Sequence, residues 1–300
     1  MAVYKKTYRP YEGVLNASWR RFWVIPRYAF EDLHRSRFLT IFYVASFLYP
    51  LIAALIVYVE HNVDALKLLN AQNAASLISI DAGFFMSFLG WQCMLALFLA
   101  AFIGPGQVSP DLGNGALSLY LARPFSRAEY ILGKLSVLWI LMSLMTWVPG
   151  LLLFCLEGYL EGSAWMAQHS RIAAGLFLGA WVWILVLSLL ALALSAWVKW
   201  KPAAGALVFG VFFVASGFGG AINQVEGTTW GSLLSINTLV GTIWVNLFTA
   251  GDSASNGGAF FRVTAGQPLP AWCCWLMLGV LCFVFLSMLR LKIRGAEVVR

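Results

Sequence analysis

The sequence predicts an all-α membrane protein with six transmembrane helices. Of its 300 residues, 61% are hydrophobic and only 11% are charged, whereas soluble domains carry about 25% charged residues. Six apolar segments without Asp, Glu, Lys or Arg each approach or exceed the ~20 residues that a membrane-crossing helix needs. Each must be helical, because lipid offers no partner for unpaired backbone groups. The segments are residues 39–59, 82–103, 135–156, 172–198, 203–222 and 271–289.

Residues 1–38 precede the first segment and form a basic arm. Trp23, Phe30 and Leu33 fall near one face of a helix, with Arg27 elsewhere. This pattern predicts an amphipathic helix that lies in the inner headgroup layer of the membrane. The alternative is a solvated arm with incidental aromatic residues. We divide the chain accordingly into this arm and a six-span transmembrane domain, residues 39–300.

The basic residues predict the orientation of the chain. Seventeen of its twenty Lys and Arg residues fall in the arm, the loop between the second and third segments, the turn between the fourth and fifth, and the C-terminal tail. Basic residues concentrate on the cytoplasmic side of membrane proteins. We therefore expect both termini in the cytoplasm. Only Lys67, Arg171 and Arg262 are expected outside.

The net charge of +7 indicates membrane lipids rather than nucleic acid as a partner. Cytoplasmic Lys and Arg side chains meet anionic lipid headgroups. Binding of nucleic acid would instead require a basic groove with stacking aromatic residues, and no such pattern is visible in the sequence.

Residues 232–250 are moderately apolar and about as long as a span. If they crossed the membrane, the last helix would be inverted and its basic tail would face outward. They also contain Asn237 and Asn246, whose amides are costly to expose to lipid. We therefore expect a re-entrant outer hairpin within residues 224–270 that is buried by protein.

The sequence contains no ATPase site of its own. A P-loop needs a Gly-Lys-Ser/Thr ending, but the one Gly-Lys pair, Gly133 and Lys134, is followed by Leu135. We expect a protein that is not an enzyme and that holds no cofactor.

No metal site is expected either. The histidines fall one to a loop, at positions 34, 61 and 169, and the five cysteines form no CxxC pair. The apolar segments also lack the ionisable residues that ion-coupled carriers use. A pathway lined by apolar, aromatic and small side chains suits lipid-like or amphipathic cargo.

The loop between the second and third segments is too apolar for a free connector. We expect a short amphipathic helix at residues 115–121 and a turn at Arg123 and Pro124. Asp111 precedes this helix, where its charge would suit a helix N-terminus. Tyr120 and Phe125 belong to an apolar cluster of the kind that marks an interaction site. A simple polar connector is the alternative.

This loop resembles the one between the second and third spans of type-2 ATP-binding-cassette (ABC) transporter permeases. Its pattern is an acid, Gly-x-Leu, a short apolar run, Arg-Pro and then Arg-x-x-Tyr-x-x-Gly-Lys. Six spans, a basic N-terminal helix and a semi-apolar outer segment before the last span are similar to that family too. The matching residues are Asp111, Gly115, Leu117, Pro124, Arg127, Tyr130, Gly133 and Lys134.

The resemblance implies that residues 111–127 form a coupling helix that docks on a separate cytosolic ATPase, which binds ATP and Mg²⁺. Family members are mainly exporters of lipid-like, amphipathic or polymeric cargo. A permease that acts mechanically on a partner protein, and an assembly protein without transport activity, are the alternatives. The implied coupling residues are Asp111, Gly115, Leu117, Tyr120, Arg123, Pro124, Phe125 and Arg127.

The resemblance also implies a location in the inner membrane of a bacterium and a second permease, either another copy or a paralogue. We expect contact through the first and fifth segments, because small residues let membrane helices approach closely. The alternative is that the glycines pack only within one subunit. The glycines of the fifth segment are Gly205, Gly210, Gly217, Gly219 and Gly220.

Overall fold

The computed structural model describes residues 26–30, 36–62, 80–116, 126–198, 200–249 and 269–298. Within these ranges all regular elements are helices, and six are long and apolar enough to cross a membrane. The predicted fold class and number of spans are therefore confirmed. Spans one to six are Arg37–Glu60, Ala82–Gly113, Arg127–Glu161, Ser170–Trp197, Lys201–Glu226 and Ala271–Ile293.

The first three spans each consist of two helices. These are α3 (Arg37–Ala45) with α4 (Leu48–Glu60), α7 (Ala82–Ile103) with α8 (Pro105–Gly113), and α10 (Arg127–Met145) with α11 (Trp147–Glu161). The last three are α13 (Ser170–Trp197), α14 (Lys201–Glu226) and α16 (Ala271–Val298). Shorter elements are α12 (Ser163–Gln168), the 3-10 helix η1 (Trp230–Leu234) and α15 (Ile236–Thr249).

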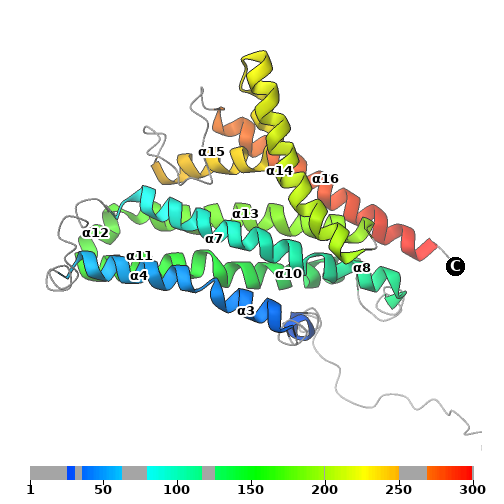
Figure 1. Ribbon diagram of the computed structural model, residues 1–300, viewed down its shortest axis with the longest axis horizontal. Coiled ribbons are helices and arrows are strands. Elements are labelled where there is room, and N and C mark those ends of the chain that lie inside the picture. The colour runs from blue at the N-terminus through cyan, green and yellow to red at the C-terminus, as the bar shows by residue number, and fades with distance from the viewer. Residues whose placement is uncertain are drawn as a thin grey trace, which may run out of the picture.

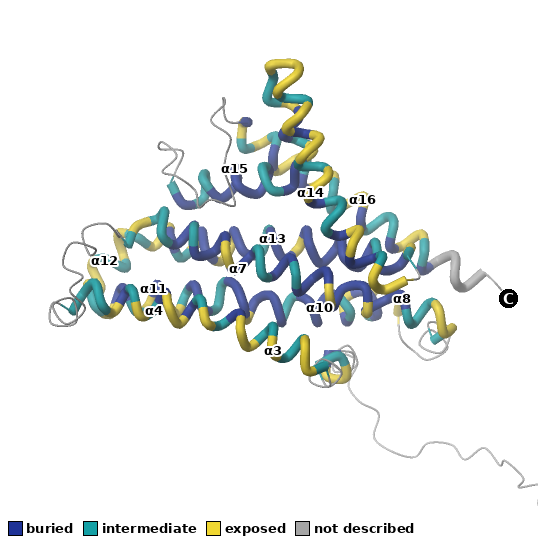
Figure 2. The backbone as a smooth tube through the Cα atoms, viewed as in Figure 1, coloured by how far each residue is buried: buried dark blue, intermediate teal, exposed yellow. Residues whose placement is uncertain are grey.

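The core of the bundle surrounds α13, which packs against α7, α8, α10, α11, α14, α15 and α16 (Figure 1). Buried residues dominate α13 and α7 in Figure 2. In an 18-residue apolar stretch of each span, 67%, 61% and 72% of the residues are buried in spans two, three and four, but only 22% in each of spans one, five and six. The latter three therefore leave broad apolar faces for lipid or for another subunit.

Charged side chains lie at the two ends of the bundle. The basic end carries Asp111, Arg127 and Lys134, and it lies near α8 at the right of Figure 1. The distal end carries His61 and Glu161, and it lies near α12 at the left. The distribution of basic residues predicts that the basic end is cytoplasmic.

Span one bends because Pro50 cannot donate a backbone hydrogen bond. Its missing N–H leaves the carbonyl of Ser46, four residues earlier, without its helical partner. The buried side chain of Gln92 in α7 donates to that carbonyl instead, at 3.3 Å. A polar residue in the middle of span two thus stabilises the bend in span one.

Span three is kinked three residues before Pro149. The break itself lies at Thr146, which has φ −104° and ψ −86° and separates α10 from α11. The ring of Pro149 clashes with the carbonyl of the residue four positions earlier, Met145, where α10 ends. The Thr146 hydroxyl donates to the Met142 carbonyl at 2.8 Å and so stabilises the break.

The side chain of Ser195 in α13 forms hydrogen bonds with backbone groups of α8. The hydroxyl of Ser195, which is fully buried, accepts from the N–H groups of Val108 and Ser109 at 3.2 and 3.1 Å. It also donates to the carbonyl of Pro105 at 2.9 Å. These groups lie near the start of α8, where backbone N–H groups lack an acceptor within the helix, so this single side chain satisfies groups that the helix itself leaves unpaired. Ser195 thereby fixes α8 to the central helix.

The helix α15 has 14 residues, so it is about 21 Å long and too short to cross the ~30 Å hydrocarbon core. Trp244 donates to the Gly179 carbonyl at 3.0 Å. Arg171 donates to the carbonyls of Asn246 and Leu247, both at 3.0 Å, near the C-terminal end of α15. The short helix therefore runs antiparallel to the first half of α13 and is largely buried by protein. These contacts agree with a re-entrant hairpin, which stays a prediction.

The helices extend beyond the apolar segments from which they were predicted. Span one starts at Arg37, after an N-cap by Ser36, rather than at residue 39. Span three runs from Arg127 to Glu161 instead of 135–156. A capping box of Ser126 and Glu129 starts it early, because the two residues satisfy each other's backbone N–H groups.

Part of the predicted interfacial helix is described. Residues 26–30 are helical, Arg27 is exposed, and Phe30 packs partly buried against the hydrophobic core. Trp23 and Leu33 lie outside the described residues. The placement of this helix in a headgroup layer stays a prediction.

Candidate functional site

At the basic end, three residues of the resembling motif converge although they come from two helices. Asp111 lies in the last turn of α8, and Tyr130 and Lys134 lie one turn apart near the start of α10. One carboxylate oxygen of Asp111 accepts a hydrogen bond from the Tyr130 hydroxyl at 2.8 Å. The same oxygen lies 2.9 Å from the Lys134 ammonium. We call these three residues the acid clamp.

The acid clamp is largely shielded from solvent. The side chain of Lys134 is 13% exposed, that of Asp111 is 16% exposed, and Tyr130 is buried. The Lys134 ammonium also lies 5.8 Å from the centre of the Tyr130 ring, within the range of a cation–π interaction. Charge-assisted hydrogen bonds are stronger than neutral ones, so the clamp holds the end of α8 against α10.

The structure gives Asp111 a partner that the sequence does not indicate. The residue lies inside α8, and its carboxylate pairs with Lys134. Most of the helix expected at residues 115–121 lies outside the described residues, so the role of Asp111 at its N-terminus stays a prediction. An ammonium with a full charge at 2.9 Å attracts a carboxylate more strongly than the partial charge of a helix end does.

Gly115 occupies a backbone conformation that favours glycine. Its φ is +66°, and an added Cβ would meet nothing within 4 Å. Glycine is therefore required by the left-handed backbone and not by a close neighbour. The residue turns the chain away from α8 directly before the loop.

The clamp fixes both ends of the predicted coupling loop. The chain leaves α8 after Gly113 and returns at Ser126, and Asp111 and Lys134 join the two flanking helices. The central coupling residues lie outside the described residues and stay predictions. They are Leu117, Tyr120, Arg123, Pro124 and Phe125.

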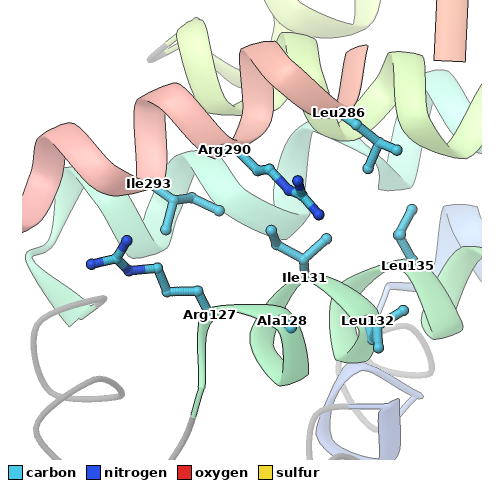
Figure 3. Close-up of a pocket in the computed structure, with 8 residues that line it drawn as sticks. All are labelled: Arg127, Ala128, Ile131, Leu132, Leu135, Leu286, Arg290 and Ile293. Carbon is cyan, nitrogen blue, oxygen red and sulfur yellow. The ribbon is translucent and has the colours of Figure 1, made fainter. Parts of the chain in front are cut away.

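Arg127 is not part of the acid clamp. It lines a pocket of about 640 Å³ between the start of α10 and the end of α16. Figure 3 shows Arg127 and Arg290 reaching into the space between the two helices. Two guanidinium groups beside apolar walls suit an acidic partner group. The apolar walls are formed by Ala128, Ile131, Leu132, Leu135, Leu286 and Ile293.

Sequence reasoning named Tyr130 and Lys134 as motif residues but did not rank them among the coupling residues. The pairing was hidden because Asp111 and Lys134 are separated by the whole loop. A signal was present, since a Lys four residues after a Tyr lies on the same face of a helix.

Most of the chain matches one known protein family. A family model described as ABC-2 family transporter protein matches residues 23–288, which covers most of the chain. A search of curated proteins gives no match. The matched region contains all six spans, the acid clamp and the loop between α8 and α10. The chain therefore belongs to the ABC-2 transporter family and is a membrane permease of that family.

Proposed function

We propose that this permease forms half of an export pathway and is driven by a separate cytosolic ATPase that docks on residues 111–127. The basic end would face the cytosol, and the ATPase would bind ATP and Mg²⁺. The apolar and aromatic surfaces of the spans favour a lipid-like, amphipathic or polymeric cargo. Movement of the coupling loop would be passed to spans two and three.

The acid clamp is the observation that carries this proposal. A docked partner can move a helix only if the loop that it pushes is rigidly attached to that helix. The loop connects α8 to α10, and the ion pair of Asp111 and Lys134 holds these two helices together at its base. Ser195 then attaches α8 to the central helix α13. A push on the loop thus acts on the core of the bundle.

Photo-crosslinking in cells tests the proposed partner. A photoreactive phenylalanine analogue at position 120 should cross-link to a P-loop ATPase, which should also co-purify in a mild detergent. The same analogue at Tyr159, which is 85% exposed near the distal end, is the matched control and should give no such product. Absence of any ATPase adduct from position 120 would favour an assembly protein without an ATPase partner.

The glycines of span five divide into two groups. A Cβ on Gly205 would lie 2.6 Å from the Ala101 carbonyl oxygen, and one on Gly219 would overlap the Gly231 carbonyl. These two glycines therefore serve packing within the chain. Gly210, Gly217 and Gly220 have no atom near an added Cβ. They leave a small-residue surface on α14 that supports the proposed contact with a second permease.

Replacement of Gly217 should separate assembly from folding. Gly217→Ile places a branched side chain on the exposed face of α14, so it should weaken the permease pair without destabilising the single chain. Dimer formation in lipid nanodiscs can be measured by mass photometry. Gly279→Ile on α16, which also has open space around its Cβ, should leave the dimer intact. An unchanged dimer in Gly217→Ile would contradict a contact through span five.

A further inference from the structure

A second cluster of charged side chains lies at the distal end, far from the acid clamp. His61 directly follows α4, and Glu157 and Glu161 lie one turn apart in α11. The Nε2 atom of His61 lies 3.1 Å from Oε1 of Glu161 and 3.7 Å from Oε1 of Glu157. The potential ligand atoms of all three residues lie within 4.8 Å of one another. The cluster therefore joins spans one and three.

The hydrogen bond of the other imidazole nitrogen determines the tautomer of His61. Nδ1 lies 3.0 Å from the Val57 carbonyl oxygen, which can only accept, so Nδ1 must carry the hydrogen. In the neutral ring Nε2 then presents a lone pair toward two carboxylates. Histidines that bind metals show this same arrangement, in which the outer nitrogen donates to a backbone carbonyl or carboxylate.

Two carboxylate oxygens at this end also lack a hydrogen-bond donor among the described residues. Glu157 is only 3% exposed, and its buried Oε2 has no hydrogen-bond partner among the described residues. The same is true of Oε2 of Glu60, the last residue of α4. Burying an ionised carboxylate without a partner is costly, and Glu157 and Glu161 at positions i and i+4 repel each other. The arrangement therefore calls for a positive charge between the two helices.

We propose that His61, Glu157 and Glu161 form a binding site for a divalent transition-metal cation of the zinc type. Nitrogen and carboxylate oxygen atoms bind zinc at about 2.0–2.2 Å, so two ligands of a tetrahedral ion lie about 3.4 Å apart. The separations of 3.1 and 3.7 Å bracket that value. Two Glu and one His leave a fourth position for water or for a group of a partner molecule.

A proton is the competitor for the same nitrogen. Burial lowers the pKa of His61, but its hydrogen bonds to Val57 and Glu161 and the nearby carboxylates outweigh burial, so that the pKa is raised. The titratable groups facing the site are Glu60, Glu157 and Glu161, with His169 close to Glu157.

Metal binding to the purified full-length chain tests the site. The protein, carrying an affinity tag without histidines, is stripped with a chelator in detergent, and Zn²⁺ binding is measured by calorimetry near pH 7.5. We expect about one tight site per chain, and loss of one ligand should weaken it by more than the roughly 10–100-fold that altered supporting residues cause. Both His61→Ala and Glu157→Gln should show this loss. Co²⁺ should give the visible absorption bands of a tetrahedral site, which both variants abolish.

A control separates this site from general attraction of cations. Glu226→Gln removes an exposed carboxylate at the end of α14 and should leave Zn²⁺ binding unchanged. Glu157→Gln keeps the size of the side chain, and size-exclusion profiles of every variant report whether it remains folded. The proposal is overturned if the stripped protein binds no stoichiometric Zn²⁺, or if His61→Ala and Glu157→Gln bind it as tightly as the parent chain. These measurements need no ATPase, so their outcome is independent of the proposed coupling.

Discussion

Lys134→Met is expected to destabilise the permease and to uncouple it from its ATPase. The variant leaves the Asp111 carboxylate, 16% exposed, with only the Tyr130 hydroxyl as partner. Removal of one partner from a buried ion pair costs about 3–5 kcal/mol, and partial exposure places the expected loss at the lower end of that range. Thermal unfolding in detergent measures the first effect. ATP turnover of the reconstituted complex measures the second.

The double variant Asp111→Asn/Lys134→Met gives the specific signature of a charge pair. It removes both charges, so no uncompensated carboxylate remains, and it should be more stable than Lys134→Met alone. Lys201→Met is the matched control, because Lys201 is an exposed residue at the start of α14, at the same end of the bundle. If Lys134→Met and Lys201→Met have the same unfolding temperature and the same ATP turnover, the acid clamp contributes neither to stability nor to coupling.

Tyr120→Ala and Phe125→Ala are each expected to weaken ATPase binding by about 2 kcal/mol, or roughly 30-fold in Kd. The reason is that buried aromatic anchors carry much of the energy of an interface. Arg127→Ala should cost less, because charges at an interface rim contribute mainly to the rate of association. Binding of the purified ATPase to the permease in nanodiscs, measured by biolayer interferometry, gives the affinities.

Two comparisons decide what these aromatic side chains contact. Tyr159→Ala removes an exposed tyrosine near the distal end and should leave the affinity unchanged. If Tyr120 and Phe125 pack against the permease itself, their variants should lower its unfolding temperature while the ATPase still binds normally. Full ATPase association and coupled turnover in both variants would refute the assignment of a coupling helix to residues 111–127.

The number of spans could be predicted because the apolar segments contain no charges, but their lengths could not. The charged residues Lys134 and Glu157 flank the apolar segment 135–156, whereas the helix continues past both, to Arg127 and Glu161. The apolar stretch reports only the part in contact with hydrocarbon. A capping box at Ser126 and the ion pair of Lys134 stabilise the additional turns at the basic end.

The contacts between individual side chains could not be predicted, because they join residues that are distant in the sequence. The motif identified Asp111 and Lys134, but only the fold shows that their charges meet. His61 and Glu161 are 100 positions apart, and no local pattern reports on such a distance. Gln92 was likewise hidden, because its role depends on a carbonyl that Pro50 releases in another span.

Span three has a mechanical consequence that follows from its length and its break. Its 35 residues extend over about 52 Å, so the two arms reach beyond both surfaces of a ~30 Å hydrocarbon layer. If the spans rock as proposed above, Thr146 is the joint between the two arms, and both arms pack against α13. If the joint is stiff, a tilt of about 5° moves the tip of the ~22 Å arm α11 by about 2 Å. The stiffness of the backbone at Thr146 thus determines how far the distal end of span three moves when its cytoplasmic end is displaced.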